Sequence, residues 1–402
     1  MEAVIVATAR TPIGRAGKGS LIDCRPDDLS ATIVGALLAK VPALDPADVE
    51  DVIWGTAQPA GEGGYNMARV VALLAGLDTT PGTTVNRYCS SSLQTIRMAA
   101  HAIKAGEGDV FVSGGVETVS RFGHGSADGL PGTHNDKFAP AHERTSARKD
   151  GGVPPWTPFD GGLPDIYIAM GQTAENVADY CDVTREEMDR FACLSQNRAV
   201  ESQENGFFER EITPVTAPDG TVVSKDDGPR PETTMEKLAA LKPAFRPDGR
   251  VTAGNACPLN DGAAAVLVMS EERANALDLK PLARIVASGV TALDPEIMGL
   301  GPIEACRQAM ARAKMTIDDI DLVEINEAFA AQVVPSAKEL NIPWEKLNVH
   351  GGAIALGHPF GMTGARIMTT LLNGLEDGNH RYGMESMCVG GGQGMAMIVE
   401  RL

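Results

Sequence analysis

The sequence predicts an α/β protein that consists of two similar halves, with a long irregular insertion in the first of them. Patterns typical of strands and helices alternate over residues 1–120, and the same order of patterns recurs over residues 281–402. Residues 121–250 lose this alternation. Strands that alternate with helices indicate a mainly parallel sheet whose faces are covered by helices. A chain of 402 residues also exceeds one ordinary hydrophobic core, which favours two or three domains.

The first half contains short apolar runs, each followed by an amphipathic stretch. Apolar residues recur at helical spacing after Cys89, and this pattern stops at Gly106, a residue that commonly ends a helix. The predicted strands are Ala3–Thr8, Asp51–Gly55 and Asp109–Ser113, and the other predicted helices are Asp27–Lys40 and Met67–Ala75.

The second half repeats this order with little sequence identity, so the repeat is inferred from the order and type of the elements. Its predicted strands are Leu282–Ser288, Asp319–Ile325 and Ser386–Val389, and its predicted helices are Pro302–Lys314 and Ile367–Gly378. We therefore expect two helix-covered sheets that derive from one duplicated unit.

The insertion is expected to begin as a loop over Arg121–Trp156 and to become helical over Met170–Glu209, with Thr184 as an N-cap. It ends as an irregular stretch over Thr213–Val251, before the strand Ala263–Met269 returns to the first pattern. An insertion of this length favours a lid or binding lobe over a solvated elaboration. The predicted domains are residues 1–120 with 251–280, residues 121–250, and residues 281–402.

The composition excludes several classes of function. A formal net charge of −18 argues against binding to nucleic acid or to an anionic membrane surface. The seven cysteines are scattered singly, which favours free thiols in a reducing compartment. No targeting segment and no apolar run of membrane-spanning length is visible, so we expect a cytoplasmic protein.

Cys89 is the first candidate for chemistry, because it directly precedes a predicted helix. Free N–H groups and the helix dipole favour an anion there, so the thiol is expected to ionise below its ordinary pKa of about 8.5. A lone cysteine is more often a small buried hydrophobic residue. Two glycine-rich stretches at 348–366 and 387–394 favour the functional interpretation instead.

Three further residues stand where sites form. Asn326 directly follows a predicted strand, His358 lies in a glycine-rich turn, and Cys388 precedes the turn that begins at Gly390. His350 is an alternative base in the same segment as His358. Metal ligation is disfavoured, because these residues lack paired ligand spacing. Two cysteines, a histidine and backbone N–H donors together suit acyl transfer combined with carbanion chemistry.

The sequence resembles the thiolase superfamily over essentially its whole length. The resemblance rests on the motifs Asn86-Arg-Tyr-Cys89, Gly254-Asn-Ala with Asn260-Asp-Gly-Ala263, Asn326-Glu-Ala-Phe329, Gly351-Gly-Ala-Ile-Ala-Leu-Gly-His-Pro359 and Cys388-Val-Gly-Gly-Gly-Gln-Gly394. It implies a five-layered αβαβα sandwich of two duplicated halves with an inserted loop domain. It also implies a homodimer or homotetramer, in some cases beside a hydratase–dehydrogenase subunit. Coenzyme A is then a substrate, with no permanently bound cofactor.

The resemblance also implies a role for each candidate. Cys89 would carry the acyl group, and His358 would deprotonate it and help to hold the thioester oxygen of the second substrate. Asn326 would position a water in that same oxyanion hole. Cys388 would move the proton at the α-carbon. The N–H groups of Cys89 and Gly390 would form the second oxyanion hole.

Coenzyme A would bind the inserted domain and the turn that begins at Ala253. The residues assigned to it by resemblance are Arg230, Met170, Ala253, Cys257 and Lys237. Four departures from the family pattern stand out. Ser92 replaces a glycine and is expected to narrow the space beside the nucleophile. Cys257 replaces a serine that bonds pantetheine, and Lys237 lies where many members carry a serine. Ala169 replaces the histidine typical of short-chain enzymes, which favours longer or bulkier acyl chains.

Several functions remain to be compared. The leading one is a degradative 3-ketoacyl-CoA thiolase of fatty-acid β-oxidation, and its near rival is a biosynthetic acetoacetyl-CoA thiolase. A ketoacyl synthase that acts on carrier protein is disfavoured by Cys388. A non-catalytic protein that binds acyl-CoA or lipid is disfavoured because all four chemical groups are retained.

Overall fold

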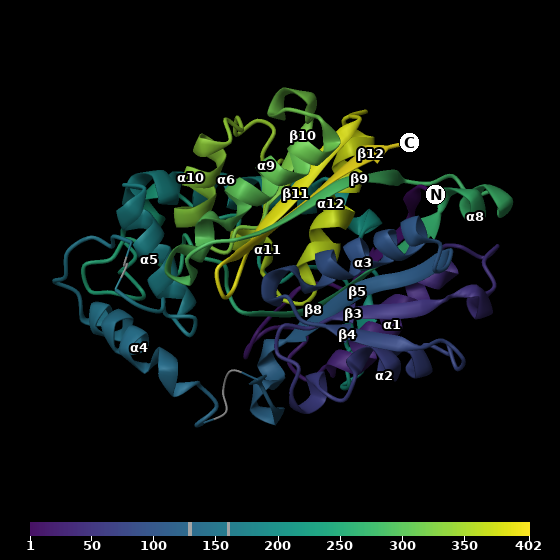
Figure 1. Cartoon of the computed structure of the whole chain (residues 1–402), viewed down its shortest axis with the longest axis horizontal. Coiled ribbons are helices and arrows are strands. Elements are labelled where there is room, and N and C mark those ends of the chain that lie inside the picture. The colour runs from purple at the N-terminus through teal and green to yellow at the C-terminus, as the bar shows by residue number, and fades with distance from the viewer. Residues whose placement is uncertain (128–130, 159–160) are drawn as a thin grey trace.

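A ten-stranded mixed sheet forms the centre of the computed structural model, which describes residues 1–127, 131–158 and 161–402 (Figure 1). The strand order is β10-β11-β12-β9-β1-β8-β5-β3-β4, and β2 pairs with β8 off this path. The strands of the first half are β1 (Ala3–Arg10), β2 (Gly14–Arg15), β3 (Asp51–Gly55), β4 (Gly82–Val85), β5 (Val110–Thr118) and β8 (Asn260–Ser270). Those of the second half are β9 (Ala283–Ala292), β10 (Leu322–Ile325), β11 (Tyr382–Val389) and β12 (Gln393–Arg401).

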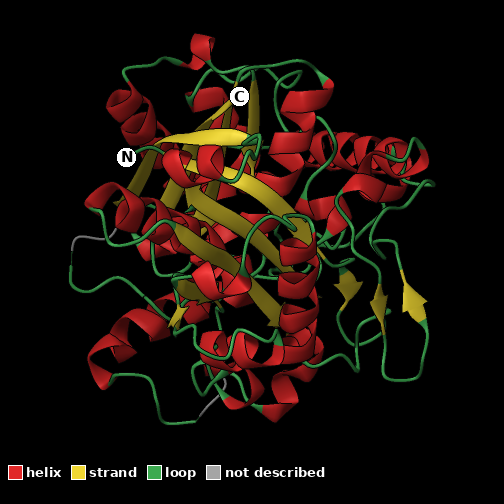
Figure 2. Cartoon of the chain, turned by 90° about the vertical axis from the view of Figure 1, so that its right-hand side faces the viewer, coloured by secondary structure: helices red, strands yellow, loops and turns green. Residues whose placement is uncertain are grey.

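Helices cover both halves of the sheet and also fill the space between them, as Figure 2 shows. The first outer layer packs on β8, β3 and β4 and contains α1 (Pro26–Ala39) and α2 (Met67–Leu74). The middle layer contacts both half-sheets and contains α3 (Ser91–Ala105) and α12 (Thr363–Asp377). The last layer shares a core with the outer face of β11 and β12 and contains α9 (Gly301–Ala313) and α10 (Ala330–Glu339). The five-layered αβαβα arrangement is therefore confirmed.

The two half-sheets have the same topology. The order β1-β8-β5-β3 in the first corresponds to β9-β12-β11-β10 in the second. In each series the first two pairings are antiparallel and the third is parallel. This match of order and direction supports the duplication that was inferred from the sequence.

Two expectations about the sheet are wrong. The sheet is mixed and not mainly parallel, because β8 and β12 each run antiparallel to both of their long neighbours. The halves also do not form separate sheets. They join where β1 pairs with β9 through Val4 with Arg284 and Ile5 with Ala283. Sequence periodicity reports which residues are apolar but not strand direction, so neither feature could be predicted from it.

The insertion contains more regular structure than expected. Its elements are α4 (Ala139–Ser146), α5 (Met170–Tyr180), α6 (Arg185–Glu204), β6 (Val215–Thr216), β7 (Val222–Val223) and α7 (Met235–Ala239). Helix α4 lies in the predicted loop 121–156, of which residues 128–130 lie outside the described residues. The strands β6 and β7 and the helix α7 lie in the stretch predicted to be irregular. Thr184 caps α6 as predicted, in a reciprocal pair with Glu187.

The remaining helices are α8 (Glu271–Ala276), which follows β8, and α11 (Ala353–Leu356), which directly precedes the turn at His358. No helix within the described ranges is long and apolar enough to cross a membrane.

Candidate active site

Cys89 lies in a tight turn between β4 and α3. The turn is a single 3-10 segment over Tyr88–Ser90 that leads directly into the helix. Tyr88 adopts φ +43°, a left-handed conformation that costs free energy in a bulky residue and is held by its neighbours. The Tyr88 N–H donates to Asn86 Oδ1 at 2.8 Å, and Ser91 Oγ donates to the Tyr88 carbonyl at 2.7 Å. The turn thus fixes the position of the Cys89 thiol, which is buried.

Burial raises the pKa of Cys89 to about 11, although the backbone N–H groups of Gly390 and of Cys89 itself act in the opposite direction. The expectation of a lowered pKa for this thiol is therefore wrong. The helix start supplies N–H groups to the sulfur, but the loss of solvation outweighs them. Two N–H groups nevertheless converge on this one sulfur from different halves of the chain.

His358 is held by hydrogen bonds on both its backbone and its ring. Its backbone N–H donates to Asn260 Oδ1 at 3.0 Å. Its Nδ1 lies 2.7 Å from the Thr363 hydroxyl, which donates its own proton to the Pro359 carbonyl at 2.8 Å. Because the hydroxyl has one proton, its oxygen must accept from Nδ1–H. This assigns the neutral tautomer with an unprotonated Nε2.

The imidazole of His358 is neutral over the physiological pH range. Burial lowers its pKa to about 3, and the nearby Arg366 guanidinium acts in the same direction. Both the buried Cys89 thiol, with its raised pKa, and the buried His358 imidazole, with its lowered pKa, are therefore uncharged at neutral pH.

Asn326 follows β10 and faces His358. Its Nδ2 lies 3.3 Å from His358 Nε2, and Gln332 donates to its backbone carbonyl at 2.7 Å. The side-chain oxygen Oδ1 is buried and has no partner among the described residues. A buried acceptor without a partner is costly, so this oxygen can receive a donor from a bound molecule.

Cys388 lies near the end of β11 and is fully buried. Burial raises the pKa of its thiol well above the usual value, and the thiols of Cys89 and Cys257 contribute in the same direction. The three sulfurs are thus close enough to influence one another. Cys257 is placed by its backbone N–H, which donates to the Ala328 carbonyl at 3.0 Å.

Two buried glutamates that the sequence analysis did not identify hold the loops around the site. Glu117 accepts from the N–H groups of Ala57 and Gly361, at 2.8 and 2.9 Å. Glu327 accepts from Ser195 Oγ at 2.6 Å and from the Ile354 N–H at 3.0 Å. The only signal for Glu117 is a carboxylate at the end of an otherwise apolar strand, whereas Glu327 lies inside a recognised motif.

Ser92 does not act as expected. Its hydroxyl accepts from the backbone N–H of Ala365 at 2.9 Å, so it is turned toward the first turn of α12. The serine therefore links the helix that follows Cys89 with the helix that follows His358. The sequence could not show this contact, because it depends on how closely the two helices approach.

A cavity of about 460 Å³ opens at Cys89, and Gly390 also lines it. The insertion contributes Met170 and the ring of Tyr167, which stacks on His134 with centroids 3.9 Å apart. No motif in the sequence identified His134 as a residue of this cavity. Met170 therefore lies on the same cavity as Cys89, and Ala169 is the N-cap residue directly before helix α5.

A second cavity of about 510 Å³ lies against the glycine-rich turn, where Ala253 and Cys257 line it together with Arg15 and Arg230. Lys237 is not among its lining residues, and its exposed ammonium group lies 3.3 Å from the Glu232 carboxylate. The alternative base His350 is also placed elsewhere. It stacks on Phe207 with centroids 3.5 Å apart.

The fold and the site define a class of protein: a duplicated α/β sandwich with buried cysteines and a buried histidine between its halves. The comparisons with known proteins agree. The family model for the thiolase N-terminal domain matches residues 3–272, and that for the thiolase C-terminal domain matches residues 279–401. The chain belongs to the thiolase family.

Several relatives match over nearly their full length. A beta-ketoadipyl-CoA thiolase of Acinetobacter baylyi is 44% identical over 410 residues, which cover 100% of both chains. A 3-ketoacyl-CoA thiolase of Pseudoalteromonas translucida is 44% identical over 408 residues, covering 99% of this chain and 98% of the relative. The crystal structure of an acetyl-CoA acetyltransferase of Bacillus anthracis has a TM-score of 0.85 at 40% identity, covering 100% and 99%.

Proposed function

We propose that the protein is a CoA-dependent thiolase, an acyltransferase that cleaves a 3-ketoacyl-CoA into acetyl-CoA and a shortened acyl-CoA and also catalyses the reverse condensation. The observation that carries this proposal is the convergence of the Gly390 and Cys89 N–H groups on the Cys89 sulfur. A nucleophile with two such donors is suited to bind the oxyanion of an acyl-transfer intermediate, at about 3–4 kcal/mol per donor.

In the first step, the Cys89 sulfur attacks the 3-keto carbon while His358 Nε2 accepts the thiol proton. The carbonyl oxygen becomes an oxyanion that the Gly390 and Cys89 N–H groups stabilise. Because the thiol and imidazole are uncharged beforehand, proton transfer is coupled to the attack rather than preceding it.

In the second step, the intermediate collapses and the bond between the α- and β-carbons breaks. The electron pair passes to the acetyl-CoA enolate, whose oxygen is held by protonated His358 and by a water at Asn326. The Cys388 thiol donates its proton to the α-carbon, and the acyl group stays on Cys89 as a thioester. Coenzyme A then gives its thiol proton to the Cys388 thiolate and attacks this thioester. The shortened acyl-CoA leaves, and protonated His358 returns its proton to the departing Cys89 sulfur, which regenerates the starting site.

The second cavity suits coenzyme A. Arg15 and Arg230 place positive charge on its wall. Ala253 and Cys257 also line it, and Cys257 is close enough to Cys89 for the two thiols to interact electrostatically. In this proposal Arg230 binds a phosphate group of coenzyme A, and Lys237 is left out because it does not line the cavity. Four further points remain predictions from the sequence. They are the domain division at residues 120, 250 and 280, a homodimer or homotetramer, a hydratase–dehydrogenase partner and a cytoplasmic location.

The acyl chain can be of two kinds. A fatty 3-ketoacyl chain, as in β-oxidation, fits the apolar part of the nucleophile cavity, which Ile166, Ile168 and Met170 line. A chain that ends in a carboxylate, as in the substrate that names the beta-ketoadipyl relatives, is favoured by the imidazole of His134 on the same lining. The alternative of an acetoacetyl-CoA enzyme leaves most of this cavity unfilled.

The test is CoA-dependent thiolysis of a 3-ketoacyl-CoA panel of increasing chain length that includes 3-oxoadipyl-CoA. Turnover of any member supports the thiolase proposal, and the preferred member identifies the chain. Cys89→Ser should abolish turnover and also acylation by acetyl-CoA, measured by intact mass. Cys388→Ser should still be acylated but should not form or break the carbon–carbon bond. The matched control is Cys193→Ser, which replaces a partly exposed cysteine of α6. Full activity of Cys89→Ser would refute the mechanism.

A further inference from the structure

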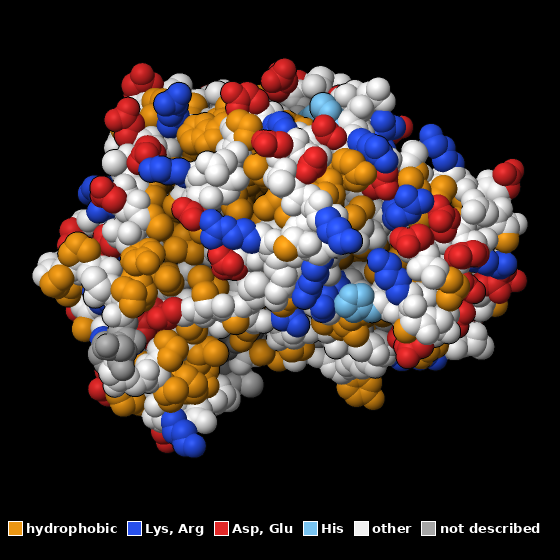
Figure 3. All heavy atoms as spheres, turned by 45° about the horizontal axis from the view of Figure 1, so that its top comes forward, with side chains coloured by type: hydrophobic (Ala, Val, Ile, Leu, Met, Phe, Trp, Pro, Cys, Tyr) orange, Lys and Arg blue, Asp and Glu red, His pale blue; other side chains and the backbone are white. Residues whose placement is uncertain are grey.

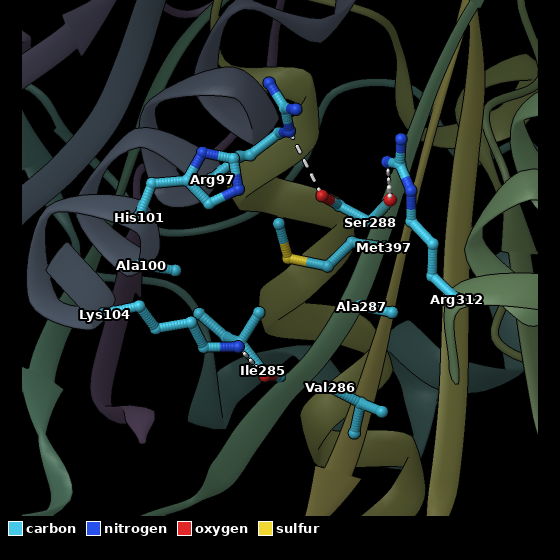
Figure 4. Close-up of a pocket in the computed structure, with 10 residues that line it drawn as sticks. All are labelled: Arg97, Ala100, His101, Lys104, Ile285, Val286, Ala287, Ser288, Arg312 and Met397. Carbon is cyan, nitrogen blue, oxygen red and sulfur yellow. Dashed lines mark hydrogen bonds between the residues drawn. The ribbon is translucent and has the colours of Figure 1, made fainter. Parts of the chain in front are cut away.

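A third cavity, here called the hollow, lies between α3, the strand β9 and the end of α9 (Figure 4). Its volume is about 340 Å³, which is within the range of small-molecule sites. Its floor is apolar, and its rim carries four basic side chains that point toward it. The floor residues are Ala100, Ile285, Ala287 and Met397, and the rim residues are Arg97, His101, Lys104 and Arg312.

The open edge of β9 holds the basic groups in place. Beyond its two paired residues with β1, this edge of β9 has no neighbouring strand within residues 1–127, 131–158 and 161–402. Ser288 bonds two guanidinium groups at once, because its Oγ accepts from Arg97 Nε at 3.1 Å and its carbonyl accepts from an Arg312 Nη at 2.6 Å. The Ile285 carbonyl accepts from Lys104 Nζ at 3.5 Å. Two carbonyls of β9, those of Ile285 and Ser288, thus already accept from basic side chains, which disfavours addition of a peptide strand there.

Each anchored arginine keeps further donors that have no partner among the described residues. Only Nε of Arg97 and one Nη of Arg312 are engaged, whereas a guanidinium carries five N–H groups. Two guanidinium groups held by one serine present their remaining N–H donors in a fixed arrangement. Paired guanidinium N–H groups match the spacing of phosphate oxygens.

The positive charge around the hollow is not balanced by neighbouring carboxylates. None of its four basic side chains forms an ion pair with a carboxylate in the part of the chain that the structure describes. The protein as a whole carries −18. Figure 3 shows Lys and Arg side chains gathered with a His on one face of the molecule. Burial lowers the pKa of Arg97, and Arg87 and Arg312 lower it further. Burial also lowers the pKa of His101, with Arg97 and Lys104 contributing.

We propose that this hollow binds a phosphate-bearing anion of nucleotide size, with the phosphate on Arg97 and Arg312 and the apolar body on the floor. The site is separate from the coenzyme A cavity, because the two share none of their lining residues, and it is also displaced from Cys89. Arg97 lies eight residues along the chain from Cys89, which corresponds to roughly 12 Å of helix. The apolar floor distinguishes a nucleotide from inorganic phosphate, since only the nucleotide has a body to cover it.

The experiment measures binding of ADP to the whole protein by calorimetry, with inorganic phosphate and adenosine as separate titrants. The double variant Arg97→Gln/Arg312→Gln should weaken ADP binding at this site at least tenfold. The matched control is Arg307→Gln, an arginine of α9 that pairs with Glu304 and Glu339. Arg230→Gln removes the proposed phosphate contact in the coenzyme A cavity, so it should leave the binding at this site unchanged.

ADP binding that is lost in the double variant and retained in the control and in Arg230→Gln supports the proposal. Weaker binding of phosphate and absent binding of adenosine support a nucleotide over a simple anion. The proposal is overturned if ADP does not bind, if the double variant binds it equally well, or if only Arg230→Gln weakens it. A double variant that instead changes the oligomeric state, measured by light scattering, would make the hollow an interface. Equal unfolding temperatures would exclude misfolding.

Discussion

The Ser92 hydroxyl accepts a hydrogen bond from the backbone N–H of Ala365 at 2.9 Å, although the two residues belong to different halves of the chain. Ser92 lies in the first turn of α3 and Ala365 in the first turn of α12. The first N–H groups of a helix have no partner within it, so this bond satisfies one of them. It therefore fixes the spacing between the helix starts that follow Cys89 and His358.

Replacing Ser92 by alanine should lower the free energy of unfolding by about 1–2 kcal/mol, because the buried Ala365 N–H then has no acceptor. Urea denaturation measures this. The matched control is Ser336→Ala, which removes a buried hydroxyl that bonds the Gln332 carbonyl within α10. A loss no larger than that of the control would show that the contact between the helices contributes nothing specific.

Cys89 should react slowly with iodoacetamide in the unliganded protein near neutral pH. Its pKa is raised to about 11 by burial, so the thiolate fraction and the alkylation rate should rise about tenfold per pH unit between pH 7 and 10. Intact mass measures the rate, and Cys89→Ser gives the background from the other cysteines. A rate that is already level below pH 8 would instead indicate a preformed thiolate–imidazolium pair.

Two buried carboxyl groups lie side by side near Asn326 and Cys388. Glu324 of β10 pairs in register with Glu385 of β11, and both are buried near the Arg366 guanidinium. Burial raises the pKa of Glu324 to about 8 and that of Glu385 well above its usual value. The carboxyl oxygens of Glu385 have no partner among the described residues. The pair therefore keeps protons at neutral pH.

The variant Glu324→Gln should gain stability relative to the wild type as the pH rises. The stability that protonated Glu324 contributes is fully present below its unfolded pKa of about 4.5 and is lost as the pH passes through about 8. Glutamine stays neutral throughout. The difference in unfolding free energy should therefore grow from pH 5 to 8, by at most about 1.4 kcal/mol per unit, and then level off. Glu272→Gln, at an exposed position of α8, is the control, and a pH-independent difference would contradict the prediction.

The variant His134→Phe should separate the two kinds of acyl chain. It keeps a planar ring for stacking on Tyr167 but removes the N–H donors from the cavity. If a terminal carboxylate binds there, kcat/KM for 3-oxoadipyl-CoA should fall about tenfold or more, which corresponds to one charge-assisted hydrogen bond. The value for 3-oxohexanoyl-CoA, which ends in a methyl group, should stay within about twofold. An equal change in kcat/KM for both substrates would show that His134 does not recognise a carboxylate.

Cys257→Ser should strengthen the binding of coenzyme A, because a hydroxyl is a better hydrogen-bond donor than a thiol. One such bond is worth about 1 kcal/mol, so the KM for coenzyme A should fall about fivefold while kcat stays similar. Steady-state thiolysis with varied coenzyme A measures both. Cys181→Ser, a partly buried cysteine outside the cavity, is the control. An unchanged KM would mean that residue 257 does not contact the substrate.

Much of the arrangement could be predicted from patterns along the chain. The helix after Cys89 ends at Gly106 in the left-handed conformation, as its spacing indicated. Asn326 and His358, which are 32 residues apart, meet as the resemblance implied. The raised pKa of Cys89 could not be predicted, because it depends on burial by distant segments. The contact of Ser92 with Ala365 likewise depends on the packing of two helices, and the hollow at Arg97 depends on an unpaired strand edge.

The duplication places the starts of α3 and α12 at equivalent positions in the two halves, since both helices form the middle layer. An ancestral unit that paired with a copy of itself would have presented the same side chains at both helix starts. In the present chain a thiol, that of Cys89, precedes one helix and an imidazole, that of His358, precedes the other. Fusion of the two copies freed each position to change alone, so a symmetric assembly of identical units could become a single site with two different ends.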